Sequence, residues 1–208
     1  MNTPSGNLFV IAAPSGAGKT SLVKALTDAV PQLQISVSHT TRAQRPGEVD
    51  TRDYFFIDEK QFAQMVEKQA FLEHATVFDH HYGTSRDWVM RQLSQGIDVI
   101  LEIDWQGAQQ IKKLFPQAVL IFILPPSIEA LMKRLQARQQ DDAETIARRM
   151  NAARDEIQHC CEFDYLVVND QFDVALQDLQ NIVLASRLQI CVQTHKQAAL
   201  LDNLLNKP

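Results

Sequence analysis

The residues best suited to chemistry lie in a glycine-rich stretch near the N-terminus, APSGAGKT at 13–20. A P-loop has the pattern Gly, four residues, Gly-Lys-Ser/Thr, and only its first glycine is replaced here, by Ala13. Backbone N–H groups of such a loop surround phosphates, its lysine contacts the β- and γ-phosphates, and its hydroxyl binds Mg²⁺. The stretch therefore predicts a polyphosphate site formed by Ala13, Pro14, Ser15, Gly16, Ala17, Gly18, Lys19 and Thr20.

Two carboxylates, Glu102 and Asp104, lie at the end of an apolar run. Open α/β sheets bind ligands at the carboxyl ends of their strands, and a carboxylate there can hold Mg²⁺ through water. Residues 104–107 also match the DxxG pattern of GTPases, so a GTPase is an alternative. The later VVND contains Asn169 and Asp170 but lacks the lysine of a guanine-reading Asn-Lys-x-Asp motif, which weakens that alternative.

A third chemical cluster is SHTTRAQRPGEV, residues 38–49, which places two arginines among hydroxyls in an acidic protein. Guanidinium groups bind phosphate bidentately, so Arg42 and Arg45 predict a clamp for a phosphorylated second substrate, with Tyr54 adding a hydroxyl. A nucleoside monophosphate kinase needs such a clamp, and a GTPase does not. A solvated loop with surface ion pairs is the alternative for this cluster taken alone.

The elements that must position these residues alternate between strands and helices. Apolar runs at 8–12, 98–103, 119–124 and 165–168 predict buried parallel strands. Helical patterns cover 20–30, 85–93, 143–158 and 172–189, and Asp58 is expected to cap another helix. This rhythm predicts an α/β fold with a parallel sheet flanked by helices.

Two segments fit the rhythm poorly and are predicted to be lobes mounted on the sheet. The first, 36–84, holds the arginine cluster, and the second, 127–157, is rich in arginine and follows Pro125 and Pro126. The remaining residues, 1–35, 85–126 and 158–208, are predicted to form the core.

Eight segments together resemble the guanylate kinase family, and in particular its bacterial housekeeping members. They run in order from residue 8 to about 188: APSGAGKT, SVSHTTRAQRPGEV, DYFF, FLEHATVF, YGTS, EIDWQGAQQI, FILPPS and VVND. The resemblance implies a P-loop NTPase-type core with inserted lobes for GMP and for a lid. It also implies transfer of the ATP γ-phosphoryl group to GMP, with Mg²⁺ as cofactor.

The resemblance also assigns roles to residues that match the family's motifs. The implied GMP-binding residues are Ser38, Arg42, Arg45, Tyr54, Glu73, Tyr82, Thr84 and Asp104. The implied catalytic residues are Lys19 and three lid arginines, Arg134, Arg138 and Arg149. Asn169 is implied near the adenine, and Thr20 and Glu102 at the metal. Two positions depart from the family: Glu102 replaces the usual Asp, and Gln139 replaces a frequent Gly.

The chemistry of guanine supports a role for Glu73. Guanine presents N1–H and N2–H₂ donors, which a carboxylate accepts together, and the hydroxyls of Ser38 and Thr84 can complete the set. Adenine would leave the buried carboxylate unpaired, which can reject a base by roughly 10⁴-fold. A surface charge at a helix end is the alternative for Glu73.

Composition restricts the partners and the compartment. The 208 residues carry a net charge of −5, so we expect no nucleic-acid partner and no membrane partner. Three cysteines, two of them adjacent, and the lack of a signal-peptide pattern predict a reducing, cytoplasmic location. The leucine-rich stretch at 198–205 could cover the core or a partner, so a homo-oligomer is possible.

Two further function classes are alternatives to an ATP:GMP kinase. A related kinase acting on a ribose bisphosphate would have no base to read, which leaves Glu73 and Thr84 without a purpose. A non-catalytic guanylate kinase-like module would bind phosphopeptides in the old GMP site. Such modules tend to have degraded P-loops and appended domains, whereas Gly16, Gly18 and Lys19 are intact here.

Overall fold

A five-stranded parallel sheet forms the centre of the computed structural model, which describes residues 6–77, 79–137 and 143–205. Its strand order is β2 (Leu33–Ile35), β7 (Asp98–Glu102), β1 (Leu8–Ala12), β8 (Val119–Leu124) and β9 (Tyr165–Val168). The four strands expected from apolar runs are thus confirmed. The short edge strand β2 was not predicted, because three residues give too little pattern to recognise.

Helices cover both faces of this sheet, so its strands are apolar on both sides. Phe9 and Ile11 of β1 pack toward α1 (Lys19–Ala29) and α7 (Phe172–Arg187). Leu8 and Val10 point the other way, toward α3 (Arg86–Ser94) and α4 (Trp105–Leu114). The parallel register places Ile11 of β1 beside Glu102 of β7, so the loops that follow these two strands begin at the same level.

A second sheet lies beside the first and belongs entirely to residues 39–85. Its order is β4 (Phe55–Phe56), β3 (His39–Thr40), β6 (His80–Ser85) and β5 (Phe71–Val77). Helix α2 (Glu59–Glu67) packs on it through Phe62, whose ring centroid is 4.7 Å from that of Phe71. Asp58 caps α2 as expected, in a capping box with Gln61.

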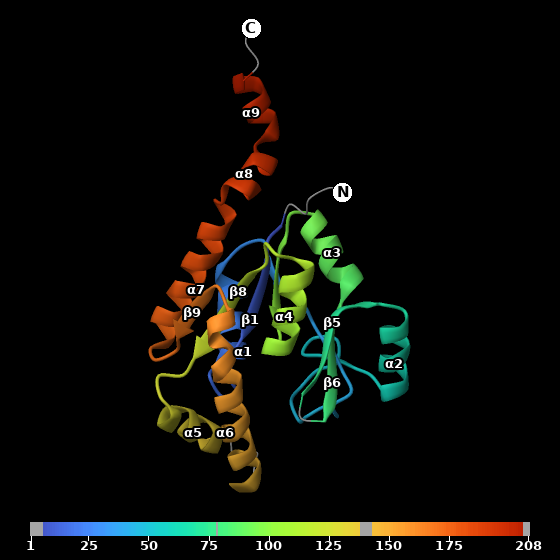
Figure 1. The fold of residues 1–208 in the computed structure, drawn as a ribbon, viewed down its shortest axis with the longest axis vertical. Coiled ribbons are helices and arrows are strands. Elements are labelled where there is room, and N and C mark those ends of the chain that lie inside the picture. Colours follow the sequence, from blue (N-terminus) through green and yellow to red (C-terminus); the bar gives the residue numbers. More distant parts are fainter. Residues whose placement is uncertain (1–5, 78, 138–142, 206–208) are drawn as a thin grey trace.

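Two helices follow β8 and form the other addition to the sheet. α5 (Ile128–Ala137) and α6 (Ala143–Gln158) pack together through a small apolar cluster formed by Leu131, Leu135, Met150 and Ala153. Figure 1 shows that this helix pair and the second sheet extend from the same end of the parallel sheet, and Arg148 of α6 lies 3.5 Å from the carboxylate of Asp79 beside β6. The division into a core and two lobes remains a prediction.

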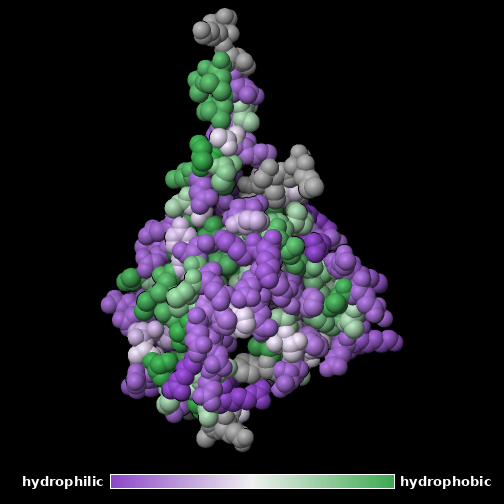
Figure 2. Space-filling view, in the orientation of Figure 1, coloured by the Kyte–Doolittle hydropathy of each residue, from purple (hydrophilic) through white to green (hydrophobic). Residues whose placement is uncertain are grey.

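The C-terminal helices extend away from the opposite end of the molecule. After the 3-10 turn η1 (His159–Glu162), β9 and α7, the chain continues into α8 (Ile190–Lys196) and α9 (Ala198–Leu205) (Figure 1). Neither α8 nor α9 contains a buried residue, and Figure 2 shows apolar side chains exposed along this projection. Thus α9 does not cover the core of its own chain. Among the described helices, none is long and apolar enough to span a bilayer.

Candidate active site

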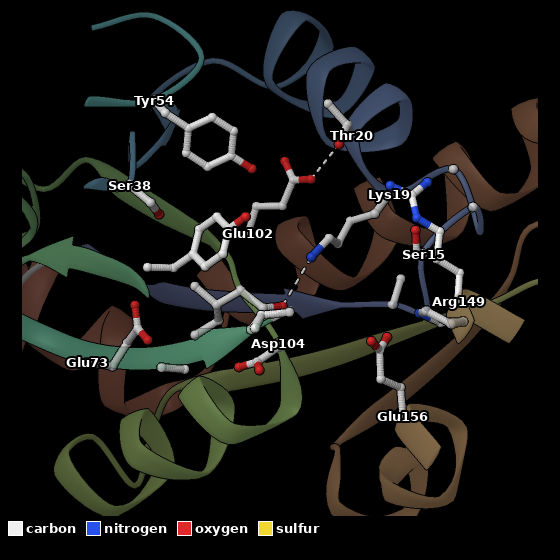
Figure 3. Close-up of a pocket in the computed structure, with 18 of the residues that line it drawn as sticks. Ser15, Lys19, Thr20, Ser38, Tyr54, Glu73, Glu102, Asp104, Arg149 and Glu156 are labelled. Atoms are coloured by element: carbon white, nitrogen blue, oxygen red, sulfur yellow. Dashed lines mark hydrogen bonds between the residues drawn. The ribbon is translucent and has the colours of Figure 1, made fainter. Parts of the chain in front are cut away.

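The P-loop connects β1 to α1 and has the conformation that its glycines allow. Gly16 and Gly18 have φ values of 94° and 92°, in the left-handed region where a Cβ would be strained. α1 begins at Lys19, so the loop brings its N–H groups to a helix N-terminus. The Lys19 ammonium donates to the carbonyl of Ile103 at 3.1 Å, which holds it above the end of β7 (Figure 3).

Two predicted site residues support the P-loop from behind. The Asn169 side chain is buried, and its Nδ2 donates to the carbonyl of Ala17 at 2.7 Å. Arg134 donates from Nη2 to the Asn169 carbonyl at 2.9 Å and from Nη1 to the Ala17 carbonyl at 3.4 Å. Their polar groups are therefore engaged with the loop backbone, and contacts of either residue with adenine or phosphate remain predictions.

A pocket in front of the P-loop brings together most of the residues expected to bind substrates (Figure 3). Four elements contribute to it: the P-loop, the carboxyl end of β7, the second sheet and helix α6. The predicted residues that line it are Ala13, Pro14, Ser15, Gly16, Gly18, Lys19, Thr20, Ser38, Arg45, Tyr54, Glu73, Tyr82, Glu102, Asp104 and Arg149.

One side of the pocket is built around a buried carboxylate. Glu73 on β5 is 3% exposed and accepts a hydrogen bond of 2.6 Å from the hydroxyl of Thr84 on β6. Burial raises the pKa of Glu73 to about 7, and the charge of Asp104 acts in the same direction, whereas the bond from Thr84 opposes it. A surface charge at a helix end, the alternative reading of Glu73, is wrong.

The arginine cluster surrounds the pocket unevenly. Arg45, Tyr54 and Tyr82 line it directly. Arg42 is buried behind them, with its guanidinium 5.3 Å from the centre of the Tyr54 ring and 2.7 Å from a carboxylate oxygen of Glu48. Arg42 does not line this pocket. It lines a second, adjoining pocket together with Arg45, His80, Tyr82, Thr145, Arg148 and Arg149.

Glu48 organises this cluster, and the sequence analysis did not select it. One of its carboxylate oxygens accepts from Arg42, and the other accepts from the backbone N–H of Arg45 at 2.8 Å. These two bonds lower the pKa of Glu48 against the opposing effect of burial. The sequence signal for Glu48 was its position in Arg45-Pro46-Gly47-Glu48, three residues after Arg45, because a turn at such a spacing lets the carboxylate return to the arginine.

The two residues expected at the metal, Thr20 and Glu102, lie side by side. The Thr20 hydroxyl donates to the Glu102 carboxylate at 2.5 Å, beside Lys19 (Figure 3). Hydroxyl and carboxylate oxygens are the ligands that Mg²⁺ prefers, so this donor set fits the ion. No cluster of three His, Cys, Asp or Glu residues suited to a metal occurs in the described part of the chain. This pair fits an ion that keeps waters and binds through substrate phosphates.

Asp104 has a structural task in addition to its place in the pocket. It is the N-cap of α4, where it accepts from the backbone N–H of Gly107 at 2.9 Å. A Cβ on Gly107 would lie 2.7 Å from a Glu73 carboxylate oxygen. The absence of a side chain at Gly107 therefore lets α4 approach the buried carboxylate, a contact that the sequence analysis did not foresee.

Helix α6 brings one predicted arginine to the pocket and one acid that was not predicted. Arg149 and Glu156 both line the pocket, seven residues apart on the same helix. Arg138 and Gln139 lie outside the described residues. The signal for Glu156 was its spacing from Arg149, because positions seven apart face the same direction on a helix.

A P-loop, a carboxyl-end pocket and a parallel sheet flanked by helices define a kinase fold of the P-loop NTPase type. A sequence profile described as "Guanylate kinase" matches residues 5–186. The chain is 60% identical over 201 residues to the guanylate kinase of Coxiella burnetii, covering 97% of this chain and 98% of that protein. It is 56% identical over 202 residues to a guanylate kinase of Legionella pneumophila, covering 97% of each.

A solved structure agrees with these sequence relatives. The crystal structure of guanylate kinase from Anaplasma phagocytophilum superimposes with a TM-score of 0.81 at 30% identity, covering 98% of this chain and 97% of that one. The chain belongs to the guanylate kinase family, and the expectation from its ordered motifs is confirmed.

Proposed function

We propose that the protein is a guanylate kinase that transfers the γ-phosphoryl group of ATP to GMP, forming ADP and GDP, and that it also accepts dGMP. One observation carries this proposal beyond family membership: Glu73, buried and bonded to Thr84, lines the same pocket as the P-loop. A base-reading carboxylate and a polyphosphate site are thereby close enough to serve two nucleotides that react with each other.

The acceptor GMP would lie with its base toward Glu73 and its phosphate toward Arg45. The ionised carboxylate accepts from guanine N1–H and N2–H₂, while Ser38 and Thr84 supply hydroxyls. The hydroxyls of Tyr54 and Tyr82 and the guanidinium of Arg45 face the same space. Arg42 adds positive charge from behind, and Glu48 keeps it and the Arg45 backbone in place.

Phosphoryl transfer needs positioning and charge neutralisation more than it needs a base. The attacking oxygen belongs to the GMP phosphate, whose second pKa is about 6, so it is already ionised near neutral pH. This oxygen forms a bond to the γ-phosphorus as the bond to the β-phosphate oxygen breaks, and the electron pair stays with ADP. Lys19 and Arg149 neutralise the developing charge, with Arg134 and Arg138 as further lid cations.

Thr20 and Glu102 are the residues that would hold Mg²⁺. The ion would neutralise charge on the β- and γ-phosphates when ATP binds. The longer side chain of Glu102 reaches the Thr20 hydroxyl, so replacement of the usual Asp retains a carboxylate at this position.

The other function classes lack support. A ribose bisphosphate has no base for the buried Glu73 carboxylate to bind. A non-catalytic module binds no polyphosphate and does not need the glycines and lysine of the P-loop. The GTPase alternative leaves the arginine cluster and the second sheet without a purpose. The family match agrees with this order of preference.

The deciding experiment compares four acceptors in one assay. Protein, Mg²⁺ and ATP are mixed with GMP, AMP, CMP or UMP, and ADP formation is followed. We expect turnover with GMP only, and a Lys19→Ala variant that folds normally without turnover. Equal rates with all four nucleotides would reject base reading, and hydrolysis of GTP without an acceptor would favour a GTPase.

We also propose the arrangement and setting in which the reaction occurs. Residues 36–84 would form the GMP-binding lobe and 127–157 the lid, and their closure would keep water from competing for the phosphoryl group. A cytoplasmic location in guanine nucleotide synthesis and recycling suits three free cysteines and the expected substrates. A homo-oligomer would be compatible with the exposed leucines of α9.

A further inference from the structure

Glu156 is the pocket residue to which the mechanism above gives no task. It lies near the end of α6, and its carboxylate points into the space beneath Lys19 and Arg149 (Figure 3). The side chain is half-buried, and no hydrogen bond or ion pair joins it to another residue within the described ranges. Burial raises the pKa of Glu156 to about 7, the charge of Lys19 acts against this rise, and that of Asp104 adds to it.

An acid in this position has no structural explanation. Removing a carboxylate from water costs free energy unless hydrogen bonds or a counter-charge offset it. Glutamine would fill the same volume at lower cost, so packing alone does not account for a charge here. Lys19 is the cation in the pocket whose charge favours the ionised form of Glu156.

We infer that Glu156 is a positioning residue for phosphoryl transfer, which orients the Lys19 ammonium from the lid helix; this rests on the proposed function. A lysine ammonium has three N–H donors. One of them is directed to the Ile103 carbonyl at 3.1 Å. The charge of the Glu156 carboxylate attracts the same ammonium across the pocket without a hydrogen bond, which restrains its position and leaves its other N–H groups for the phosphate.

The spacing on α6 couples this restraint to lid position. Arg149 and Glu156 are two turns apart on one helix face, so they reach the pocket together. The same movement that brings Arg149 to the phosphates brings the countercharge to Lys19. The full set of cations is therefore oriented only when α6 lies over the P-loop, which limits transfer to water before the acceptor is enclosed.

The test compares Glu156→Gln with the wild type and with Asp155→Asn. Asp155 is an exposed acid next to Glu156 on the same helix, so its variant controls for loss of one charge from α6. The measurements are kcat and KM for ATP and GMP, the dissociation constant of ATP without GMP, and Tm. Glu156→Asp retains the charge on a shorter arm and is measured alongside.

We expect Glu156→Gln to lower kcat on the order of 10- to 100-fold, because a misplaced catalytic cation weakens transition-state stabilisation. ATP should bind as well as before or more tightly, since a negative charge near its phosphates is gone. The Tm should stay the same or rise, Asp155→Asn should match the wild type, and Glu156→Asp should recover part of kcat.

Two results would overturn the inference. An unchanged kcat in Glu156→Gln would show that Lys19 needs no such restraint. A lower Tm with a parallel loss of ATP and GMP binding would show a packing role instead. Failure of the wild type to phosphorylate GMP would reject the proposed function itself, and it is seen in a separate measurement.

Discussion

At the scale of single residues, the environment of Glu73 links base recognition to pH. Its folded pKa of about 7 lies above the ordinary value of 4.5 because the side chain is buried. Between these two values the folded protein holds a proton that the unfolded chain has lost, so this group makes the free protein less stable as pH rises. GMP binding has the opposite sign, because the guanine donors need the ionised carboxylate.

We therefore expect GMP affinity to fall as pH drops below about 7, approaching tenfold per unit once Glu73 is mainly protonated. Titration of GMP binding by calorimetry from pH 5.5 to pH 8.5 would measure this dependence. The GMP phosphate titrates nearby, at about 6, so Glu73→Gln is the matched control for its contribution. Wild type and variant showing the same pH slope would contradict the assignment.

The same variant makes a prediction about affinity at pH 8. Glutamine presents N–H₂ where guanine also presents donors, so one charge-assisted hydrogen bond is lost and a donor faces a donor. KM for GMP should rise about 10- to 100-fold, with KM for ATP unchanged. An equal loss for ATP would mean that Glu73 supports the pocket in general.

Residues carried by a local motif could be predicted, whereas residues that depend on packing could not. The P-loop glycines and Thr20 are recognised because their chemistry and spacing occur within eight residues. Gly107 acts through Glu73, which only the folded chain brings near. Glu48 and Glu156 lie near Arg45 and Arg149 in the sequence, but their spacing alone does not show what they contact. The hydrogen bond from the Asn169 amide to the carbonyl of Ala17 could not be predicted from the sequence, and its expected place near the adenine stays a prediction.

At the scale of elements, the approach of α4 to β5 determines how closely the guanine pocket is built. Gly107 lies in the first turn of α4, where a Cβ would meet the Glu73 carboxylate at 2.7 Å. The Cβ would meet Oε2, while Thr84 donates to Oε1 of the same buried carboxylate, so a shift of the carboxylate would disturb that bond.

Gly107→Ala is therefore expected to impair GMP recognition more than folding. Alanine favours the helix by about 1 kcal/mol over glycine, which offsets part of the crowding. We expect KM for GMP to rise while KM for ATP and the Tm change little. The mutation Ala108→Gly, one residue on, should lower Tm without this selective effect, because Ala108 packs against the sheet and not against Glu73. A parallel rise in both KM values for Gly107→Ala would point to distortion of α4 as a whole.

The helices and strands also fall into two groups, those that the sequence predicts and those that depend on contacts in the folded chain. The central strands and the longer helices have enough apolar period to be predicted, and they appear at the expected positions. The second sheet was expected only as an inserted lobe, because β3 and β4 have two residues each. Strands of that length are defined by their partners: β3 pairs with β6, a distant segment of the chain, and β4 pairs with β3.

At the scale of the whole molecule, a protein with a net charge of −5 brings three cations into one pocket, beside the carboxylates of Glu73, Glu102, Asp104 and Glu156. Lys19, Arg45 and Arg149 reach it from three elements that are far apart in sequence. Two anionic nucleotides bound side by side repel each other, and these cations offset that repulsion. The proposed binding mode places the second sheet and α6 against the ligands, so ligands should stabilise the fold as well as react.

Thermal unfolding measures this stabilisation without any turnover. GMP at 100 times its dissociation constant should add about 2.7 kcal/mol. For a chain of 208 residues this corresponds to a rise in Tm of roughly 5–10 °C. ADP with GMP should raise Tm further, because the P-loop and the second sheet are then both occupied. AMP at the same concentration should produce almost no shift through the acceptor site, and Glu73→Gln should remove most of the GMP shift. A shift of equal size with AMP in the presence of saturating ADP would mean that the acceptor pocket binds phosphate without reading the base.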